Sequence, residues 1–259
     1  MNDKELEKIA KNLLETFLVA GRKSIEIREQ GLKIKIKTDK SPVTNGDIEV
    51  DELLRKKIIN ITPNIPVISE ETVNLKDKNK NKNFWLIDPI DGTKDYINNR
   101  DEFTLNAALI INLEPVLGII YVPAKKRLFY SYGNGHAYEE FEKKKIKLEC
   151  KKKTKLGEVY AVSNSSTPSS EIIEIHKKYN VKKFINMRSS YKFCVIASGE
   201  FDLYVAKARA NEWDIAAGHA IVKHAGGLVT TMRGEKFTYG KPDYKNLDLL
   251  VRRSTSLEK

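Results

Sequence analysis

The sequence predicts two joined halves, an α+β half built on an antiparallel sheet followed by an α/β half. Two helical patterns open the chain, and closely spaced strand patterns follow them up to residue 141. From about residue 146 the pattern changes to alternating strands and helices. A chain of 259 residues is long enough for two modest domains with hydrophobic cores. We therefore expect an N-terminal α+β domain over residues 1–145 and a C-terminal α/β domain over residues 146–259.

The chain begins with a predicted helix over residues 4–29, whose apolar side chains recur with the i, i+3, i+4 spacing of an amphipathic helix. These side chains are Leu6, Ile9, Ala10, Leu13, Leu14, Phe17 and Leu18. Leu32, Ile34 and Ile36 then alternate with lysines, which predicts a half-buried strand that ends in a turn at Ser41-Pro42. A second helix is expected over residues 47–60.

Six further strands complete the predicted first half. They are expected at residues 65–69, 84–88, 103–112, 116–122, 127–132 and 135–141. The most membrane-like stretch is 105–122, but it is interrupted by Asn106, Asn112, Glu114 and Pro115. Because such residues are costly in hydrocarbon, we expect two strands joined at a turn and no integral membrane segment.

The second half is predicted to contain a smaller α/β sheet. Its strands are expected at residues 158–163, 183–187, 201–205, 227–232 and 247–251, and its helices at 169–179, 189–199 and 213–225. The boundary between the halves lies in residues 143–155, which are rich in charge and poor in apolar residues. This stretch is too short to act as a flexible tether.

Cysteine usage and the chain start indicate a cytoplasmic protein. Cys150 and Cys194 lie far apart and in no ligand-like spacing, which favours a reducing compartment over a disulfide framework or a zinc site. The start at Met1-Asn2-Asp3-Lys4-Glu5-Leu6 has no apolar signal region and no small-residue cleavage site. The sequence leaves open whether the protein is a monomer or a homodimer.

The net charge of +11 raises the question of nucleic-acid binding. Part of the excess comes from Lys143-Lys144-Lys145 and Lys151-Lys152-Lys153, which lack interleaved aromatic residues and any groove-reading motif. Lysine is abundant along the whole chain, so solvated surface lysine explains the charge better. We expect no nucleic-acid partner. A positive field would still attract small phosphorylated substrates.

Four carboxylates stand at the ends of predicted core elements. Glu70 closes a strand, Asp88 and Asp91 follow an apolar run, and Asp214 opens a helix. Taken singly, these residues fit a solvated strand edge, a turn and helix caps. Taken together with small turn residues, they provide the oxygen ligands that hard divalent cations require. The combination predicts a metal-dependent phosphatase.

The segment Asp88-Pro89-Ile90-Asp91-Gly92-Thr93 follows a buried strand. Because Pro89 blocks the regular continuation of that strand, we expect Asp88 and Asp91 on a tight turn, where both can converge on one ion. Gly92 allows close backbone approach. The amides of Gly92 and Thr93 would open a short helix and form an anion pocket beside the metals.

Three separated motifs resemble those of the inositol monophosphatase superfamily of metal-dependent, lithium-sensitive phosphatases. They are Ile68-Ser69-Glu70-Glu71, the Asp88 to Thr93 segment, and Trp213-Asp214-Ile215-Ala216-Ala217-Gly218 with Ala225-Gly226-Gly227 closing the helix. The resemblance covers nearly the whole chain in the expected order. It implies a layered α/β/α/β/α sandwich of the inositol monophosphatase and fructose-bisphosphatase type.

Within that superfamily, the chain is most similar to the 3'(2'),5'-bisphosphate nucleotidase branch, which removes the 3'-phosphate from adenosine 3',5'-bisphosphate. The similar segments are residues 37–47, Lys94 after Asp-Gly-Thr, and Ser189-Ser190-Tyr191-Lys192-Phe193-Cys194. Other phosphatases of the superfamily, which act on inositol or sugar phosphates, are the alternative. A noncatalytic basic protein that binds nucleic acid is the third class.

Two departures from that branch fall in the expected pocket for the second phosphate. Ser163-Asn164-Ser165-Ser166 stands where the branch has Ser-Arg-Ser-His, and Ala206 stands where it has arginine. Lys207 and Arg209 are candidate replacements, although lysine cannot reproduce the bidentate geometry of a guanidinium group.

The resemblance implies a set of metal ligands. Glu70, Asp88 and the carbonyl group of Ile90 would hold a first Mg²⁺ ion. Asp88, Asp91 and Asp214 would hold a second, with Asp88 bridging the two. Mn²⁺ prefers similar ligands and is an alternative, and a third ion stays open.

The resemblance also implies catalytic and substrate contacts. Asp47, hydrogen-bonded to Thr93, would orient the attacking water, and Glu70 would act as a ligand of the ion that activates it. The substrate contacts would be Gly92, Thr93, Lys94, Ser189 and Lys192. In the alternative interpretation Asp47 is a helix N-cap, a role that can coexist with catalysis, and Lys192 is a surface lysine. Tyr191 and Trp213 are expected to be packing residues.

Overall fold

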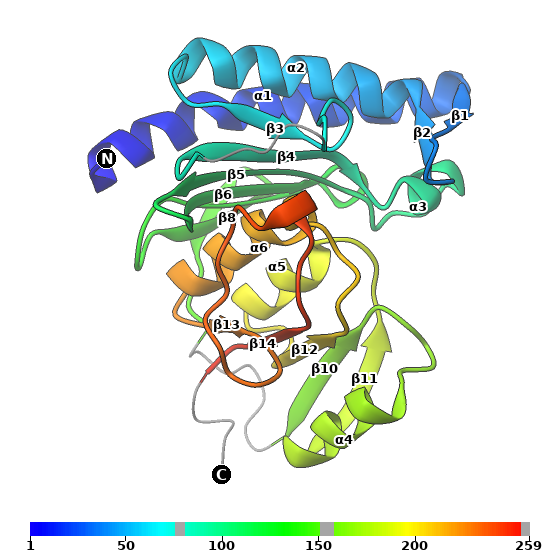
Figure 1. Cartoon of the computed structure of the whole chain (residues 1–259), viewed down its shortest axis with the longest axis vertical. Coiled ribbons are helices and arrows are strands. Elements are labelled where there is room, and N and C mark those ends of the chain that lie inside the picture. Colours follow the sequence, from blue (N-terminus) through cyan, green and yellow to red (C-terminus); the bar gives the residue numbers. More distant parts are fainter. Residues whose placement is uncertain (76–80, 151–157, 255–259) are drawn as a thin grey trace.

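Helical and sheet layers alternate through the computed structural model, which describes residues 1–75, 81–150 and 158–254. From one side to the other, the order of the layers is α/β/α/β/α (Figure 1). This confirms the layered sandwich that the sequence predicts.

The first layer consists of two long helices, α1 (Asp3–Gln30) and α2 (Asn45–Ile61), which lie side by side on the larger sheet (Figure 1). Their buried side chains include Leu13 and Phe17 from α1 and Leu54 from α2. Each helix begins with a capping box that satisfies free backbone amides. The prediction of an amphipathic first helix is therefore confirmed, and its apolar face packs against the sheet.

The larger sheet contains seven strands in the described residues, in the order of the chain. They are β3 (Val67–Ser69), β4 (Phe84–Asp91), β5 (Thr104–Ile111), β6 (Glu114–Val122), β7 (Arg127–Ser131), β8 (Ala137–Phe141) and β9 (Lys144–Lys147). All neighbours are antiparallel except β3 and β4, which are parallel. The predicted antiparallel sheet is therefore correct for every pair except β3 and β4, where the long connection permits a parallel crossover.

Strand β4 is buried on both faces, which explains its continuous apolar sequence. Trp85 and Ile87 belong to the core beneath α1 and α2, whereas Phe84 and Leu86 belong to the core on the opposite side. The first half of β4, which leads into Asp88, is therefore held between two packed layers.

The central layer contains α5 (Tyr191–Ala197) and α6 (Glu212–His224), which lie between the two sheets (Figure 1). Gly118 of β6 lets α6 approach closely, because a Cβ atom at this position would lie only 2.4 Å from the carbonyl oxygen of Ala217. Helix α6 therefore packs directly on the backbone of the large sheet at β6.

The smaller sheet has the strand order β11-β10-β12-β14-β13. Its strands are β10 (Val159–Ser163), β11 (Val181–Asn186), β12 (Leu203–Ala206), β13 (Leu228–Thr230) and β14 (Leu249–Arg252). Helix α4 (Ser170–Lys178) covers its outer face, where Ile172 packs against Leu203 and Leu250. The predicted alternation of strands and helices in the second half is confirmed.

Two strands near the start of the chain differ from the sequence-based expectation. The strand predicted from Leu32 is β1 (Ile34–Ile36), paired with an unpredicted β2 (Pro42–Thr44). It is not half-buried, because Ile34 and Ile36 are 49% and 67% exposed. The alternating pattern is present, but in the described structure no layer covers the apolar side chains of this two-stranded ribbon.

The short elements are α3 (Thr93–Ile97) and two 3₁₀ turns, η1 (Pro123–Lys125) and η2 (Pro242–Tyr244). Strand β9 occupies the start of the predicted boundary region, and Lys151-Lys152-Lys153 lie outside the described residues. Over residues 1–75, 81–150 and 158–254, none of the helices combines the length and the apolar character needed to cross a membrane.

Candidate active site

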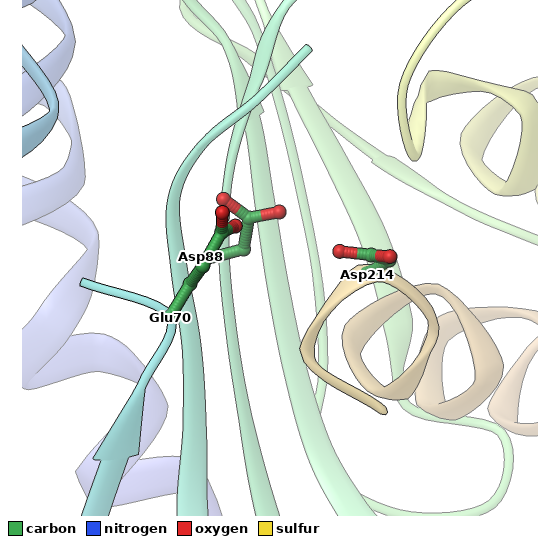
Figure 2. A group of neighbouring side chains, drawn as sticks. All are labelled: Glu70, Asp88 and Asp214. Carbon is green, nitrogen blue, oxygen red and sulfur yellow. The ribbon is translucent and has the colours of Figure 1, made fainter. Parts of the chain in front are cut away.

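Three carboxylates from different elements meet between the large sheet and the central helices. They are Glu70, directly after β3, Asp88 in β4 and Asp214 in α6, and each offers an oxygen atom within 4.8 Å of the others (Figure 2). The side chain of Asp88 lies next to Glu70, and that of Asp214 faces them from the start of α6. The structure therefore brings together three of the four predicted carboxylates in one group.

The backbone around Asp88 differs from the tight turn that the sequence predicts. Strand β4 continues through Pro89 to Asp91, and its pairing with β5 is interrupted between Asp88, opposite Asn106, and Asp91, opposite Thr104. This interruption adds one residue to β4, as in a β-bulge, and Pro89 is tolerated there because a regular ladder bond is not required. Because of the extra residue, two carboxylates three positions apart can lie on the same side of the strand.

Asp91 lies beside the group of three carboxylates and is held by α5. Its Oδ2 atom accepts hydrogen bonds from the backbone amide of Ser190 at 2.5 Å and from the hydroxyl group of Ser190 at 2.6 Å. The negative charge of Asp91 helps to raise the pKa of Asp214. All four predicted carboxylates thus share one electrostatic environment.

Asp47 and Asp214 occupy the same local position in two different helices. Each is the third residue of its helix, and its Oδ2 atom accepts the backbone N–H of the N-cap residue at 2.8 Å, Thr44 in α2 and Asn211 in α6. The interpretation of either aspartate as the N-cap itself is therefore wrong. In both side chains the cap holds one oxygen, so that the orientation of the other is fixed.

Burial and mutual repulsion disfavour the charged forms of these acids. Burial first, and then the charges of Glu70 and Asp91, raise the pKa of Asp88 well above its usual value. Burial, with Asp91 and Glu70, raises the pKa of Asp214 to about 8. Burial is also the main cause of the raised pKa of Glu70. A cation at this position would reverse all three effects.

The donor set fits a divalent metal ion. Asp88 is 2% exposed, and its Oδ1 atom has no hydrogen-bond partner within the described residues. A buried carboxylate oxygen without a partner is costly, and hard cations such as Mg²⁺ prefer carboxylate and carbonyl oxygen ligands. The unpartnered oxygen therefore points to a ligand for a cation rather than a structural aspartate.

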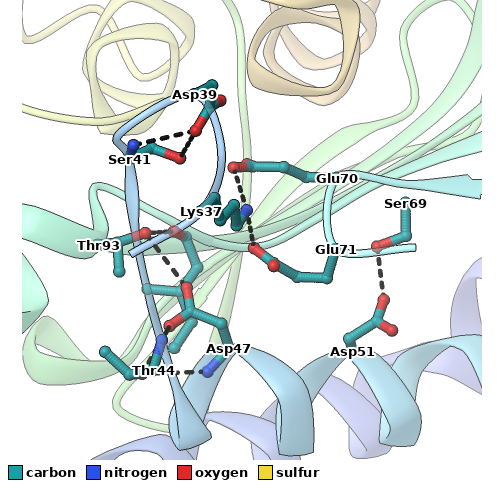
Figure 3. A network of polar contacts seen from close by, with 11 residues as sticks. Lys37, Asp39, Ser41, Thr44, Asp47, Asp51, Ser69, Glu70, Glu71 and Thr93 are labelled. Atoms are coloured by element: carbon teal, nitrogen blue, oxygen red, sulfur yellow. Dashed lines mark hydrogen bonds and ion pairs between the residues drawn. The ribbon is translucent and has the colours of Figure 1, made fainter. Parts of the chain in front are cut away.

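Glu70 is positioned by contacts on both sides. The preceding Ser69 donates its hydroxyl group to Asp51 of α2 at 2.5 Å, which attaches the end of β3 to the helix. The ammonium group of Lys37 lies 3.0 Å from Glu70 Oε1 and 2.7 Å from Glu71 Oε1 (Figure 3). Lys37 is the first residue of the segment 37–47, but no sequence pattern predicts this contact.

Glu71 is not part of a solvated strand edge, because its side chain is only 4% exposed. Burial raises the pKa of Glu71 to about 7, although the ion pair with Lys37 opposes this change. Lys37 therefore holds two adjacent glutamates next to the acidic group. The pattern of lysine and two distant glutamates carries no signal in sequence, since the pairing depends on the β1–β2 ribbon.

The predicted contact between Asp47 and Thr93 is present. The Thr93 hydroxyl group lies 3.2 Å from Asp47 Oδ1 and 3.2 Å from the carbonyl oxygen of Ile90 (Figure 3). Asp47 is fully buried, and burial raises its pKa. The arrangement places a carboxylate, a hydroxyl group and a backbone carbonyl next to one another beside the acidic group.

A cavity of about 560 Å³ lies in front of these groups. Its lining includes Glu70 and Asp91 together with all five predicted substrate contacts, Gly92, Thr93, Lys94, Ser189 and Lys192. Gly92 has a φ of +91°, a conformation that favours glycine. Five basic side chains also line the cavity, namely Lys94, Arg100, Arg188, Lys192 and Arg209. An anionic ligand therefore fits this cavity.

Lys192 is not a surface lysine, because it is 5% exposed. Burial lowers its pKa to about 8, although the nearby charge of Asp91 opposes this change. Tyr191 and Trp213 are buried, as expected for packing residues. Lys192 is thus a buried cation next to Asp91, and it faces the same cavity as the acidic group.

The two candidate replacements for the missing basic residues have different surroundings. Lys207 forms an ion pair of 2.7 Å with Glu171. Arg209 lines both the main cavity and a neighbouring pocket of about 80 Å³, which also contains Tyr204, Lys192 and Ala206. Within the described residues, the structure gives the Arg209 side chain no hydrogen bond or ion pair. Arg209 is therefore the better placed of the two.

Comparison with known proteins gives a consistent result. A family model described as "Inositol monophosphatase family" matches residues 3–253. The chain is 36% identical over 212 residues to the 3'(2'),5'-bisphosphate nucleotidase CysQ of Buchnera aphidicola subsp. Acyrthosiphon pisum, covering 80% of this chain and 78% of that protein. It is 34% identical over 209 residues to the protein of the same name from Escherichia coli strain K12, covering 78% and 81%.

A solved structure with the same arrangement is that of CysQ from Bacteroides thetaiotaomicron, described as a bacterial member of the inositol monophosphatase family. It has 32% sequence identity and a TM-score of 0.76, and the match covers 94% of this chain and 96% of that one. The similarity therefore includes both sheets and the helices between them.

Proposed function

The chain belongs to the inositol monophosphatase family of metal-dependent phosphatases, and we propose that it removes the 3'-phosphate from adenosine 3',5'-bisphosphate. The observation that carries this proposal is a cavity lined both by Glu70 and Asp91 of the acidic region and by the buried Lys192. Such a cavity suits a substrate with one phosphate at a metal centre and a second anionic group near basic side chains. The identity of 34–36% to proteins named 3'(2'),5'-bisphosphate nucleotidase supports a bisphosphate nucleotide as the substrate.

We propose Mg²⁺ as the ion, with Mn²⁺ as an alternative because it accepts similar ligands. Glu70, Asp88 and the Ile90 carbonyl group would hold one ion, and Asp88, Asp91 and Asp214 a second. When bound, such ions polarise phosphoryl oxygens and lower the pKa of a nearby water. The unpartnered Oδ1 atom of Asp88 supports its assignment as a ligand of both.

Asp47 is proposed to orient the attacking water. Its Oδ2 atom is held by the amide and hydroxyl groups of Thr44, at 2.8 and 2.5 Å, so only Oδ1 and the Thr93 hydroxyl group remain for the reaction. Because the carboxylate is fixed by its own helix, it can receive a proton at Oδ1 without rearranging. Thr93 would keep the water in line with phosphorus.

The proposed phosphate contacts are the amides of Gly92 and Thr93 together with Lys94, which is exposed at the cavity wall. Ser189 and Lys192 are proposed to contact the distal phosphate or the ribose. Lys192 is suited to this role because a buried ammonium group interacts strongly with an anion in a site from which water is excluded. Its position beside Asp91 keeps it close to the reacting phosphate as well.

A superfamily phosphatase for inositol or sugar phosphates is the second candidate. It is favoured by one observation, namely that Ala206 in the neighbouring pocket cannot provide the guanidinium group that the nucleotidase branch has there. Arg209 lines the same pocket, so a guanidinium group is still present there, although from another position in the sequence. The two candidates therefore differ in whether a second anionic group improves the substrate.

A substrate panel with free phosphate as the readout tests the proposal. With Mg²⁺ supplied, the enzyme should release phosphate from adenosine 3',5'-bisphosphate much faster than from inositol 1-phosphate. The reverse preference would reject the nucleotidase assignment in favour of the second candidate. If no phosphorylated compound in the panel is hydrolysed and the protein binds DNA in a salt-dependent manner, the enzymatic assignment itself is wrong.

A further inference from the structure

Ser190 lies between two of the proposed metal ligands, which come from different layers of the fold. Its backbone amide and its hydroxyl group both contact Asp91 Oδ2, at 2.5 and 2.6 Å, and the hydroxyl group also lies 2.9 Å from the carbonyl oxygen of Asp214. Ser190 is 1% exposed, so no bulk water competes for these contacts. One small side chain thus connects the end of β4 with the start of α6.

Ser190 stands at the N-cap position of α5, but its side chain makes no hydrogen bond to that helix. Serine at this position ordinarily accepts a hydrogen bond from an amide in the first turn of its own helix. Here the hydroxyl group is directed to Asp91 instead. The helix start is served by the adjacent Ser189, whose hydroxyl oxygen accepts the amide N–H of Tyr191 at 3.3 Å.

The direction of the Ser190 proton is set by Asn106 of β5. The Asn106 side-chain amide donates to Ser190 Oγ at 2.8 Å, so the hydroxyl oxygen acts as an acceptor in that contact. The single hydroxyl proton is then available to Asp91 Oδ2 or to the Asp214 carbonyl oxygen. An ionised carboxylate is the stronger acceptor, so the proton is given to Asp91. Asn106 is also the partner of Asp88 in the β4–β5 pairing.

We propose that Ser190 and Asn106 form a positioning pair that fixes the orientation of Asp91 for metal binding. The pair holds Oδ2, so Oδ1 is the oxygen left for a cation. This fixation matters at Asp91 because the β4 ladder is irregular there and the backbone alone constrains the side chain less. The inference rests on the proposed function, since it takes Asp91 as a metal ligand.

Removal of a group that orients a metal ligand typically lowers metal affinity by about 10- to 100-fold. Ser190→Ala keeps the backbone amide contact but loses the hydroxyl group, so we expect Mg²⁺ affinity to fall by roughly tenfold or more. Asn106→Ala leaves Ser190 in place but removes the amide donor that sets the direction of the Ser190 hydroxyl proton. We therefore expect a smaller loss in the same direction for this variant.

The experiment measures Mg²⁺ binding to the substrate-free protein by titration calorimetry, together with the rise in Tm between chelator and saturating Mg²⁺. Ser198→Ala is the matched control, because Ser198 lies at the other end of α5 and its hydroxyl group contacts Val195 and Glu200. The control should bind Mg²⁺ like the wild type. Ser190→Ala should show weaker binding and a smaller rise in Tm.

Wild-type Mg²⁺ affinity in Ser190→Ala would overturn the inference. If that variant does not fold, Asn106→Ala decides, and unchanged affinity there would equally reject the pair. The binding readout uses no substrate, so it separates this inference from the proposed function. The two hypotheses can therefore fail separately. If the wild-type protein hydrolyses no bisphosphate but Ser190→Ala still weakens Mg²⁺ binding, the positioning pair is supported and only the nucleotidase activity is rejected.

Discussion

The hydroxyl group of Thr93, the first residue of α3, donates a hydrogen bond of 3.2 Å to Asp47 Oδ1 in the first turn of α2. The two residues are far apart in sequence and belong to different elements. Because Thr44 holds the other oxygen of Asp47, the carboxylate has one fixed orientation toward the cavity. Asp47 is thus held by hydroxyl and amide donors and is not one of the three clustered carboxylates Glu70, Asp88 and Asp214. This difference is consistent with a role in orienting water rather than in binding metal.

The first prediction concerns Asp47→Asn. The substitution keeps the size of the side chain but removes the charge that would accept a proton, so the turnover number should fall by about 10²- to 10⁴-fold. Metal affinity, measured by calorimetry, should stay close to the wild-type value. A collapse of metal affinity would instead identify Asp47 as a ligand. Thr93→Ser, which keeps the hydroxyl group, serves as the conservative control.

The second prediction is that Asp88→Asn abolishes turnover and metal binding while stabilising the metal-free protein. Asp88 is buried among like charges, so removal of its charge relieves repulsion when no cation is present. Relief of about 1 kcal/mol would raise Tm by roughly 2–4 °C in the presence of a chelator. Glu174→Gln, an equal loss of charge on the exposed side of α4, should change neither property. Nearly normal activity in Asp88→Asn would contradict the ligand assignment.

The layers of the fold could be predicted because they depend on local patterns. The apolar spacing in α1 and the uninterrupted run in β4 each indicate how many faces of the element are buried, and the structure confirms both. The strand at Ile34 has an equally clear pattern, but its apolar side chains remain exposed. Periodicity reports which residues share a face, whereas the layer that covers that face is a property of the whole fold.

The site was predictable to a different extent. Glu70, Asp88 and Asp214 could be identified because each stands at the end of a core element, where the chain must leave the packed layers. The ion pair of Lys37 with Glu71 and the contact of Ser190 with Asp91 could not. Both depend on segments that meet only after folding. The course of β4 through Pro89 was also missed, because a bulge is decided by the partner strand.

The third prediction separates Arg209 from Lys207. Arg209→Ala should raise the KM for adenosine 3',5'-bisphosphate by roughly tenfold, as expected for the loss of a charge-assisted contact. The KM for a monophosphate should change little. Lys207→Ala should have a small effect, because Lys207 is paired with Glu171 at the surface. The opposite pattern would identify Lys207 as the contact with the second phosphate, and equal effects of Arg209→Ala on both substrates would remove Arg209 from that role.

The fourth prediction concerns acid stability and depends on His224, which lies away from the cavity. The ring Nδ1 atom lies 2.9 Å from the Ser131 hydroxyl group and accepts the Gly133 amide N–H at 3.3 Å, and the residue is 4% exposed. Burial, with the nearby charge of Lys223, lowers the pKa of His224 to about 3. The folded protein therefore keeps this ring neutral under conditions in which the unfolded chain binds a proton.

The sign of the effect follows from this difference in proton binding. An unfolded histidine titrates near pH 6.5, so the free energy of unfolding should decrease as the pH falls from about 6.5 toward 3, by at most about 1.4 kcal/mol per pH unit from this residue. His224→Asn keeps an acceptor near the position of Nδ1 but cannot be protonated. It should lower stability at neutral pH through lost packing, yet show a shallower decrease in acid. Denaturant unfolding of both proteins between about pH 4 and 7, in the presence of a chelator, measures the two slopes, and identical slopes would show that His224 does not contribute to acid sensitivity.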